Sequence, residues 1–174
     1  MLTAAPVVLS LHQRSAPLDA RERIWAAVAD LPARPDLLTL MSCHRVEVYA
    51  ALDGESARRE VLERALGTAG PDLAHARWIA GEDAVRHLFR VAAGIDSVVV
   101  GEGQIGGQLR RSHLEARRRG LHPVLDRALQ RALAVARELR TTTWPAGADR
   151  SVGSLAVDAA LSQLQDPREA TALV

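Results

Sequence analysis

The sequence contains one cysteine, Cys43, and its neighbours are residue types that assist nucleophilic chemistry. It lies in the segment 42–49, Ser-Cys-His-Arg-Val-Glu-Val-Tyr, where His44 supplies an imidazole and Arg45 a guanidinium. A thiolate is the nucleophilic form of cysteine, and nearby positive charge favours it. Arg45 also presents a planar fork of donors that suits a carboxylate. From these residues alone, a reactive thiol and a buried structural cysteine are about equally expected.

The chain around Cys43 predicts a position between two strands. The apolar run 37–41 leads into the cysteine, and apolar residues then alternate at positions 46, 48, 50 and 52. Strands hold the segment between them rigidly, and such connecting segments often carry reactive groups. We therefore expect Cys43 to be accessible at a strand end.

The first half of the chain reads as alternating strands and helices. Strands are predicted over residues 6–11, 37–41, 46–52 and 76–80, and helices over 18–31 and 54–66. Asp19 is the expected cap of the first helix, and the glycines and proline of residues 67–71 end the second. This βαββαβ order predicts an α+β fold, with a small mixed or antiparallel sheet in ferredoxin-like order and helices on one face.

The second half is predicted to be helical. Helical periodicity covers residues 82–93, and the Gly- and Gln-rich segment 101–108 leads into an Arg-rich helix that ends near Gly120. Further helices are predicted from Pro123 to about Thr142 and over residues 151–164. Nine arginines against three acidic residues lie between positions 105 and 140. They predict either a footprint for tRNA phosphates or a solvated helix face.

Composition sets broad limits on the protein class. The 174 residues fit one domain of ordinary size, and the formal net charge is only +1. No segment predicts a membrane span or a secretory signal, and a single cysteine predicts a reducing, cytoplasmic setting. There is no lysine, so no lysine can act as a base or form a Schiff base. The last residues, 170–174, read as the opening of a buried strand, which predicts a further domain.

Four segments, in order along nearly the whole chain, resemble the N-terminal catalytic domain of glutamyl-tRNA reductase. This family catalyses the first committed step of tetrapyrrole (5-aminolevulinate, porphyrin) synthesis by the five-carbon route. Residues 42–49 resemble its Thr-Cys-Asn-Arg-Thr-Glu-Ile-Tyr signature, and residues 100–108 resemble its Gly-Glu-Pro-Gln-Ile-Leu-Gly-Gln block. Residues 9–23 resemble its first strand, loop and helix start, and residues 87–97 resemble its central block.

The resemblance implies a mechanism and a set of site residues. Cys43 would attack the ester that joins glutamate to tRNA, and NADPH on a following Rossmann domain would reduce the thioester to glutamate-1-semialdehyde. His87 would be the second catalytic residue and assist proton transfer. The implied substrate-binding residues are Ser42, His44, Arg45, Ser97, Glu102, Gly103, Gln104 and Gln108. Three of these residues have simpler explanations: a surface imidazole at a helix start for His87, an N-cap for Ser97, and a helix-dipole contact for Glu102.

The chain also departs from the family pattern. His44, Val46 and Gly103 replace the family's Asn, Thr and Pro. No Gly-X-Gly-X-X-Gly segment follows a predicted strand, so we expect no NADPH site of the family's kind in this chain. The implied organisation is a catalytic domain over 1–148, the start of a long linker helix over 149–166, and the first residues of an NADPH-binding domain over 167–174. A homodimer is implied for the full-length protein.

Two other functions remain open from the sequence. One is a stand-alone, non-reducing relative that serves as a binding or regulatory module for tRNA or haem. The other is a cysteine hydrolase of activated acyl esters, which needs the thiol but no cofactor. A reading frame that continues beyond residue 174 into a glycine-rich loop would favour the reductase over both.

Overall fold

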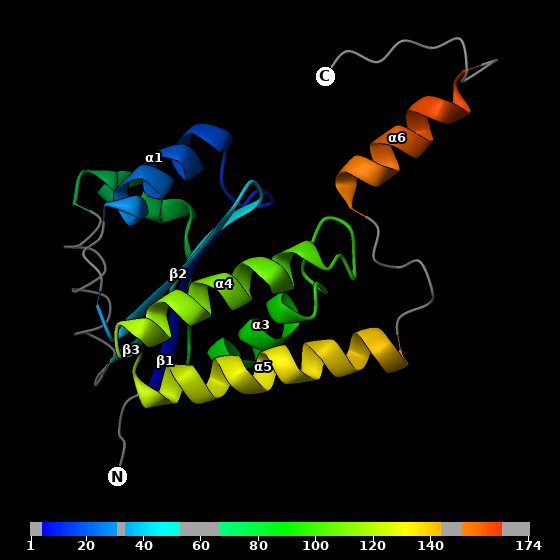
Figure 1. The fold of residues 1–174 in the computed structure, drawn as a ribbon. Helices are drawn as coiled ribbons and strands as arrows, with labels where there is room; N and C mark the ends of the chain where they lie inside the picture. Colours follow the sequence, from blue (N-terminus) through cyan, green and yellow to red (C-terminus); the bar gives the residue numbers. More distant parts are fainter. Residues whose placement is uncertain (1–4, 31–33, 53–66, 144–150, 165–174) are drawn as a thin grey trace.

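A computed structural model describes residues 5–30, 34–52, 67–143 and 151–164 (Figure 1). None of the helices in these ranges is long and apolar enough to cross a membrane. In chain order the elements are β1 (Ala5–His12), α1 (Leu18–Ala29), β2 (Leu37–Ser42), β3 (Arg45–Leu52), the 3-10 helix η1 (Gly67–His75), β4 (Arg77–Ala80), α3 (Gly81–Ala92), α4 (Gln104–Arg118), α5 (Pro123–Thr142) and α6 (Val152–Ser162).

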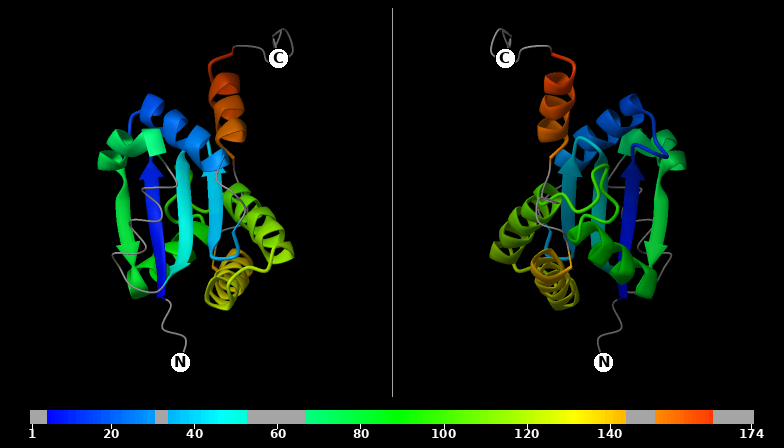
Figure 2. Two further views of the ribbon diagram at one scale, coloured as in Figure 1. Left: turned by 90° about the vertical axis from the view of Figure 1, so that its left-hand side faces the viewer. Right: turned by 90° about the vertical axis from the view of Figure 1, so that its right-hand side faces the viewer.

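The four strands form one antiparallel sheet in the order β2-β3-β1-β4, which Figure 2 shows side by side. β1 and β3 pair along their full length, from Ala5 opposite Leu52 to His12 opposite Arg45. These strands confirm the α+β class and the small antiparallel sheet. The helix predicted over residues 54–66 lies outside the described residues, so the full ferredoxin-like order stays a prediction.

Helices cover both faces of the sheet, where the sequence predicted one helical face. α1 and η1 pack on the face that carries Val7, Leu9, Val46 and Val48. α3, α4 and α5 pack on the opposite face, with Val8, Leu38, Leu40 and Tyr49. The alternation of side chains along β1 and β3 assigns neighbouring residues to these two cores. The sheet is therefore buried on both sides, and polar side chains on it need partners.

Three expected helix positions differ in detail. Pro17 is the N-cap residue of α1, while Asp19 lies in the first turn and pairs with Arg23 at 3.1 Å. An acidic residue there is favoured by the helix dipole. Ser97 caps no helix, because α4 begins after Gly103. His87 lies in the middle of α3 and not at a helix start.

The loop between α3 and α4 folds back on itself. The amide of Gly101 donates to the carbonyl of Gly94 at 3.0 Å, and Gly94 has a φ of 75°. A Cβ at Gly94 would lie 2.9 Å from the backbone oxygen of Glu102, so the close approach requires glycine. A Gly-X-Gly-X-X-Gly spacing does occur at residues 101–106, but it spans the end of this loop and the start of α4 and follows no strand. Its last glycine, Gly106, lies within α4 next to the guanidinium of Arg140, which would have to shift to admit a Cβ there.

Candidate functional site

Cys43 lies at the tip of the β2–β3 hairpin and is exposed. Only Cys43 and His44 separate the two strands, with Ser42 paired opposite Arg45. The backbone oxygen of Cys43 accepts a hydrogen bond from Nη1 of Arg21 at 2.6 Å, which ties the turn to α1. The expectation of an accessible thiol at a strand end is confirmed.

A cavity of about 280 Å³ opens beside this thiol, and we call it the cysteine cavity. It gathers eight of the ten site residues predicted from the sequence: Ser42, Cys43, His44, Arg45, Ser97, Glu102, Gln104 and Gln108. Apolar side chains of the α3–α4 loop, α4 and α6 complete the lining, namely Val98, Ile105 and Val152. Residues far apart in the sequence therefore meet around the nucleophile.

Each wall of the cysteine cavity comes from a different element. The hairpin supplies the thiol, and the closed α3–α4 loop supplies Ser97 and Glu102, which are 4% and 8% exposed. Gln104 and Gln108 lie one turn apart at the start of α4, so they share a helix face. The two amides and one carboxylate offer donors and acceptors for a small polar substrate.

His44 also lines the cysteine cavity, and its Nδ1 lies 2.8 Å from Oε1 of Gln13. Neighbouring residues of a strand point to opposite faces of the sheet. Cys43 and His44 both belong to the turn between β2 and β3, where this rule does not apply. The imidazole is held by a neighbour and remains close to the thiol-bearing residue.

Arg45 is almost fully buried and holds the site together. Its Nη1 lies 3.3 Å from Oε1 of Glu47, and its Nη2 donates to the backbone oxygen of Asp96 at 2.6 Å. Asp96 directly precedes Ser97, so this bond attaches the α3–α4 loop to β3. Arg45 lines the cysteine cavity and also a second one. A ligand carboxylate would meet only the guanidinium edge that these two bonds leave.

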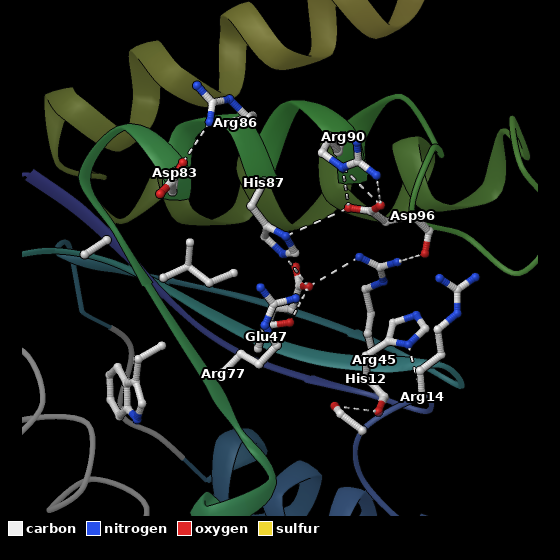
Figure 3. Close-up of a pocket in the computed structure, with 15 residues that line it drawn as sticks. His12, Arg14, Arg45, Glu47, Arg77, Asp83, Arg86, His87, Arg90 and Asp96 are labelled. Atoms are coloured by element: carbon white, nitrogen blue, oxygen red, sulfur yellow. Dashed lines mark hydrogen bonds and ion pairs between the residues drawn. The ribbon is translucent and has the colours of Figure 1, made fainter.

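The second cavity, of about 620 Å³, lies between the sheet and α3, and we call it the histidine cavity (Figure 3). His87 lines it and does not line the cysteine cavity. Its Nε2 lies 2.8 Å from Oε1 of Glu47, and its Nδ1 lies 4.0 Å from Oδ2 of Asp96. The structure therefore places the two predicted catalytic residues on different cavities, which share Arg45.

Glu47 is the centre of this network and is completely buried. Ser10, Tyr49, His87 and Arg45 all direct polar groups at its carboxylate. Burial alone would raise the pKa of Glu47, but the hydrogen bond and charge of His87, the charge of Arg45 and the Tyr49 hydrogen bond lower it to about 2. The carboxylate therefore stays ionised and can orient Arg45.

Other ionisable groups of the histidine cavity are also shifted. Burial, followed by the charges of Arg45 and Arg14, lowers the pKa of His12 and favours its neutral ring. Burial opposes ionisation of Asp96, but hydrogen bonds from Arg90 at distances down to 2.6 Å lower the pKa of that carboxyl. Both carboxylates near Arg45 are thus kept charged.

Gly103 is the other predicted residue that the cysteine cavity does not include. It lines a separate hollow with Glu102, Gln104, Arg140 and Ser151. Its φ of −77° lies within the range that proline imposes. The proline that the family pattern places here would therefore suit this backbone.

Sequence reasoning missed two groups that the site uses. Glu47 was part of the quoted signature, yet no role was predicted for it. The feature that points to such a role is a charged residue on a strand that has helices on both faces. Arg21, which binds the Cys43 carbonyl, carried no signal beyond its place in the first helix.

The described residues contain no dinucleotide site of the Rossmann kind. Their sheet is wholly antiparallel, and no strand in it runs through a glycine loop into a phosphate-binding helix start. Within the same ranges, no three His, Cys, Asp or Glu side chains are grouped to hold a metal ion. The arginines of α4 and α5 are mostly exposed, and Arg117 pairs with Asp126 at 3.1 Å. That exposure suits both the tRNA footprint and a solvated face.

Comparison with known proteins links this site to one family. The family model described as "Glutamyl-tRNAGlu reductase, N-terminal domain" matches residues 9–143. Glutamyl-tRNA reductase of Deinococcus radiodurans is 38% identical over 178 residues, which cover 97% of this chain and 50% of that protein. The Thermus thermophilus protein of the same name is 38% identical over 170 residues, covering 94% of this chain and 42% of the relative.

The structural comparison agrees. Glutamyl-tRNA reductase from Methanopyrus kandleri aligns with a TM-score of 0.65 and 27% sequence identity, over 94% of this chain and 41% of that one. The chain spans half or less of the length of each of these three relatives. The chain belongs to the glutamyl-tRNA reductase family, of which it carries the N-terminal domain.

Proposed function

We propose that this chain is the part of a glutamyl-tRNA reductase that binds glutamyl-tRNA and forms a thioester on Cys43, in tetrapyrrole synthesis. The observation that carries the proposal is the cysteine cavity, where an exposed thiol meets seven other residues that the family signatures implicate. The sulfur attacks the ester carbonyl, a carbon–sulfur bond forms, and the bond from that carbon to the ribose oxygen breaks. The leaving oxygen takes a proton and restores the tRNA hydroxyl.

The cavity supplies groups for the glutamyl part. The carboxylate of Glu102 suits the substrate ammonium, and the amides of Gln104 and Gln108 suit its polar atoms. Arg45 is the cation that lines the same space and can meet the substrate carboxylate with its free edge. Val46 cannot line this cavity, because its side chain belongs to the opposite core. His44 is therefore the family departure that bears most directly on substrate binding.

We propose a positioning role for His87. It contacts Glu47, and Glu47 contacts Arg45, so the imidazole acts on the cysteine cavity through the buried carboxylate. This chain of contacts supports control of Arg45 more than direct proton transfer at the ester. His87→Ala should accordingly weaken substrate binding before it slows the chemical step.

Reduction of the thioester is assigned to no residue of this chain. NADPH supplies a hydride in the reaction named for this family, and the proposed place for it is a domain that follows residue 167. In the same proposal residues 1–148 form the catalytic domain and residues 149–166, which include α6, begin a linker helix. The full-length protein would be a cytoplasmic homodimer. Without the cofactor domain, water would hydrolyse the thioester and release glutamate.

The test is product analysis with glutamyl-tRNA, in the presence and absence of NADPH. The 174-residue chain should release glutamate slowly and form no semialdehyde under either condition. Cys43→Ser should abolish or greatly slow release, because a serine hydroxyl is a poor nucleophile without a dedicated base. Formation of semialdehyde would overturn the assignment of the cofactor to another domain. Equal release by the parent and Cys43→Ser would favour a tRNA-binding module instead.

A further inference from the structure

Cys43 and Ser42 also line a second hollow, on the side of the hairpin that faces α1. This hollow has a volume of about 390 Å³, and we call it the tryptophan hollow. Its other lining residues are Leu18, Arg21, Glu22, Trp25 and Val46. The thiol therefore borders two spaces, and the function proposed above uses only the cysteine cavity.

The tryptophan hollow offers an aromatic surface next to the nucleophile. α1 buries Ala20, Ile24 and Val28 against the sheet, while Trp25 remains 39% exposed and Leu18 60% exposed. Leu18 and Trp25 are seven residues apart, so they lie two turns from each other on one helix face. Exposed aromatic and apolar side chains that gather at a hollow offer a surface to a ligand.

Arg21 provides the second, independent observation. Its Nη1 donates to the carbonyl of Cys43, but its Nε–H is buried and none of the described residues accepts a hydrogen bond from it. A buried donor without an acceptor costs free energy. The guanidinium of Arg21 also lines the tryptophan hollow, where its positive charge suits an oxygen of a bound molecule.

We propose that the tryptophan hollow binds the 3′-terminal nucleoside of the aminoacyl-tRNA, with its base stacked on Trp25 and an oxygen of its sugar or phosphate accepting from Arg21. This inference rests on the proposed function. An acyl ester has two sides, and the attacking sulfur must lie where they join. Cys43 borders both spaces, so the cysteine cavity takes the glutamyl side and the tryptophan hollow takes the leaving group.

The chemistry of the hollow matches an adenosine, the nucleoside at the end of every tRNA. Bases stack on aromatic side chains, and one such contact is worth about 1–3 kcal/mol, or roughly five- to 150-fold in binding. The carboxylate of Glu22 can accept from the exocyclic amine of adenine. A volume of 390 Å³ lies within the ~300–1,000 Å³ of small-molecule sites.

The kinetic experiment compares two acyl donors on the 174-residue chain. One is glutamyl-tRNA, and the other is glutamate α-methyl thioester, which carries no nucleoside. Trp25→Ala should lower the rate constant for Cys43 acylation by subsaturating glutamyl-tRNA at least fivefold and leave acylation by the thioester unchanged. Trp25→Phe should restore most of the rate with tRNA. Leu114→Ala, which removes an exposed apolar side chain on α4, is the control and should change neither rate.

A binding experiment gives a readout that does not depend on catalysis. Adenosine 5′-monophosphate should quench the fluorescence of Trp25 in a variant with Trp78→Phe and Trp144→Phe. If that variant does not fold, the difference in quenching between the parent and Trp25→Phe gives the same information. Arg21→Met should weaken the quenching, because it removes the guanidinium that lines the hollow.

The outcomes separate this inference from the proposed function. If Trp25→Ala leaves acylation by both donors unchanged and the nucleotide causes no quenching, the nucleoside site is overturned. The thioester mechanism would still stand. Equal slowing of both donors by Trp25→Ala would show a structural role and would also overturn it. Quenching without acylation of the parent would overturn the mechanism and support the nucleotide site. Absence of both signals would refute both proposals.

Discussion

Arg45 and Glu47 form a buried ion pair, with 3.3 Å between Nη1 and Oε1, in the wall between the cysteine and histidine cavities. Their side chains are 2% and 0% exposed. Removal of one partner from such a pair leaves an uncompensated buried charge, whose cost is far larger than the net gain from forming the pair. The pair also joins β3 to the α3–α4 loop through Asp96. It therefore couples the stability of the fold to the shape of the site.

The first prediction concerns the pH dependence of stability. The folded-state pKa of Glu47 is about 2, below its ordinary value of 4.5, so ionisation favours the folded state. This stabilisation is complete above pH 4.5 and is lost as the pH falls toward 2, by roughly 3 kcal/mol. Denaturant titrations at several pH values should show the loss in the parent. In Glu47→Gln the loss of stability that comes from protonation of this residue should vanish. A pH profile of stability equal to that of the parent would contradict the lowered pKa of Glu47.

The second prediction concerns Arg45→Lys. Lysine keeps the charge but cannot bond Glu47 and the Asp96 carbonyl as a planar fork. We expect glutamyl-tRNA binding to weaken about tenfold, since the α3–α4 loop and the substrate carboxylate both lose a contact. Arg110→Lys on the exposed face of α4 is the matched control. Parent-like binding by Arg45→Lys would remove Arg45 from the site.

The third prediction separates two roles of His87. If it positions Arg45 through Glu47, His87→Ala should raise KM for acylation severalfold with a smaller fall in kcat. His87→Gln, which restores a hydrogen-bond donor, should recover part of the loss. A large fall in kcat at unchanged KM would instead indicate proton transfer at the ester.

The fourth prediction concerns the backbone at Gly103. Its φ of −77° is compatible with proline, and a compatible proline lowers the entropy of the unfolded chain. Gly103→Pro should therefore raise the free energy of unfolding by about 0.4–1 kcal/mol. Urea denaturation of both proteins measures this. A loss of stability would show that the amide or the preceding residue does not tolerate the ring.

The sequence allowed much of the fold to be predicted. Strand positions followed from apolar alternation, and β1, β3 and β4 lie within a residue or two of the expected ranges. The helix Pro123–Thr142 lies where it was predicted. Its start was indicated by Pro123, since proline is favoured at the first position of a helix. The presence of helices on both faces of the sheet was not predicted. The hydrophobic periodicity of a helix shows that one side of it is buried, but not on which face of the sheet it packs.

The sequence indicated which residues belong to the site, but not that they divide between two cavities. Family signatures indicated seven residues that do surround Cys43, together with His87 and Gly103, which do not. Sequence order cannot show that Arg45 lies between two cavities, because this depends on how α3 packs over β3. The role of Glu47 was hidden for the same reason. A buried carboxylate is recognised only when its partners from β1, β3 and α3 are in place.

The most direct measurement is intact-protein mass spectrometry of the chain after incubation with glutamyl-tRNA and rapid acid quenching. We expect one added glutamyl group, located on Cys43 by peptide mapping, released by hydroxylamine and absent from Cys43→Ala. The uncharged tRNA should appear at the same rate as the adduct. An unmodified parent, or an adduct that persists in Cys43→Ala, would show that Cys43 is not the nucleophile.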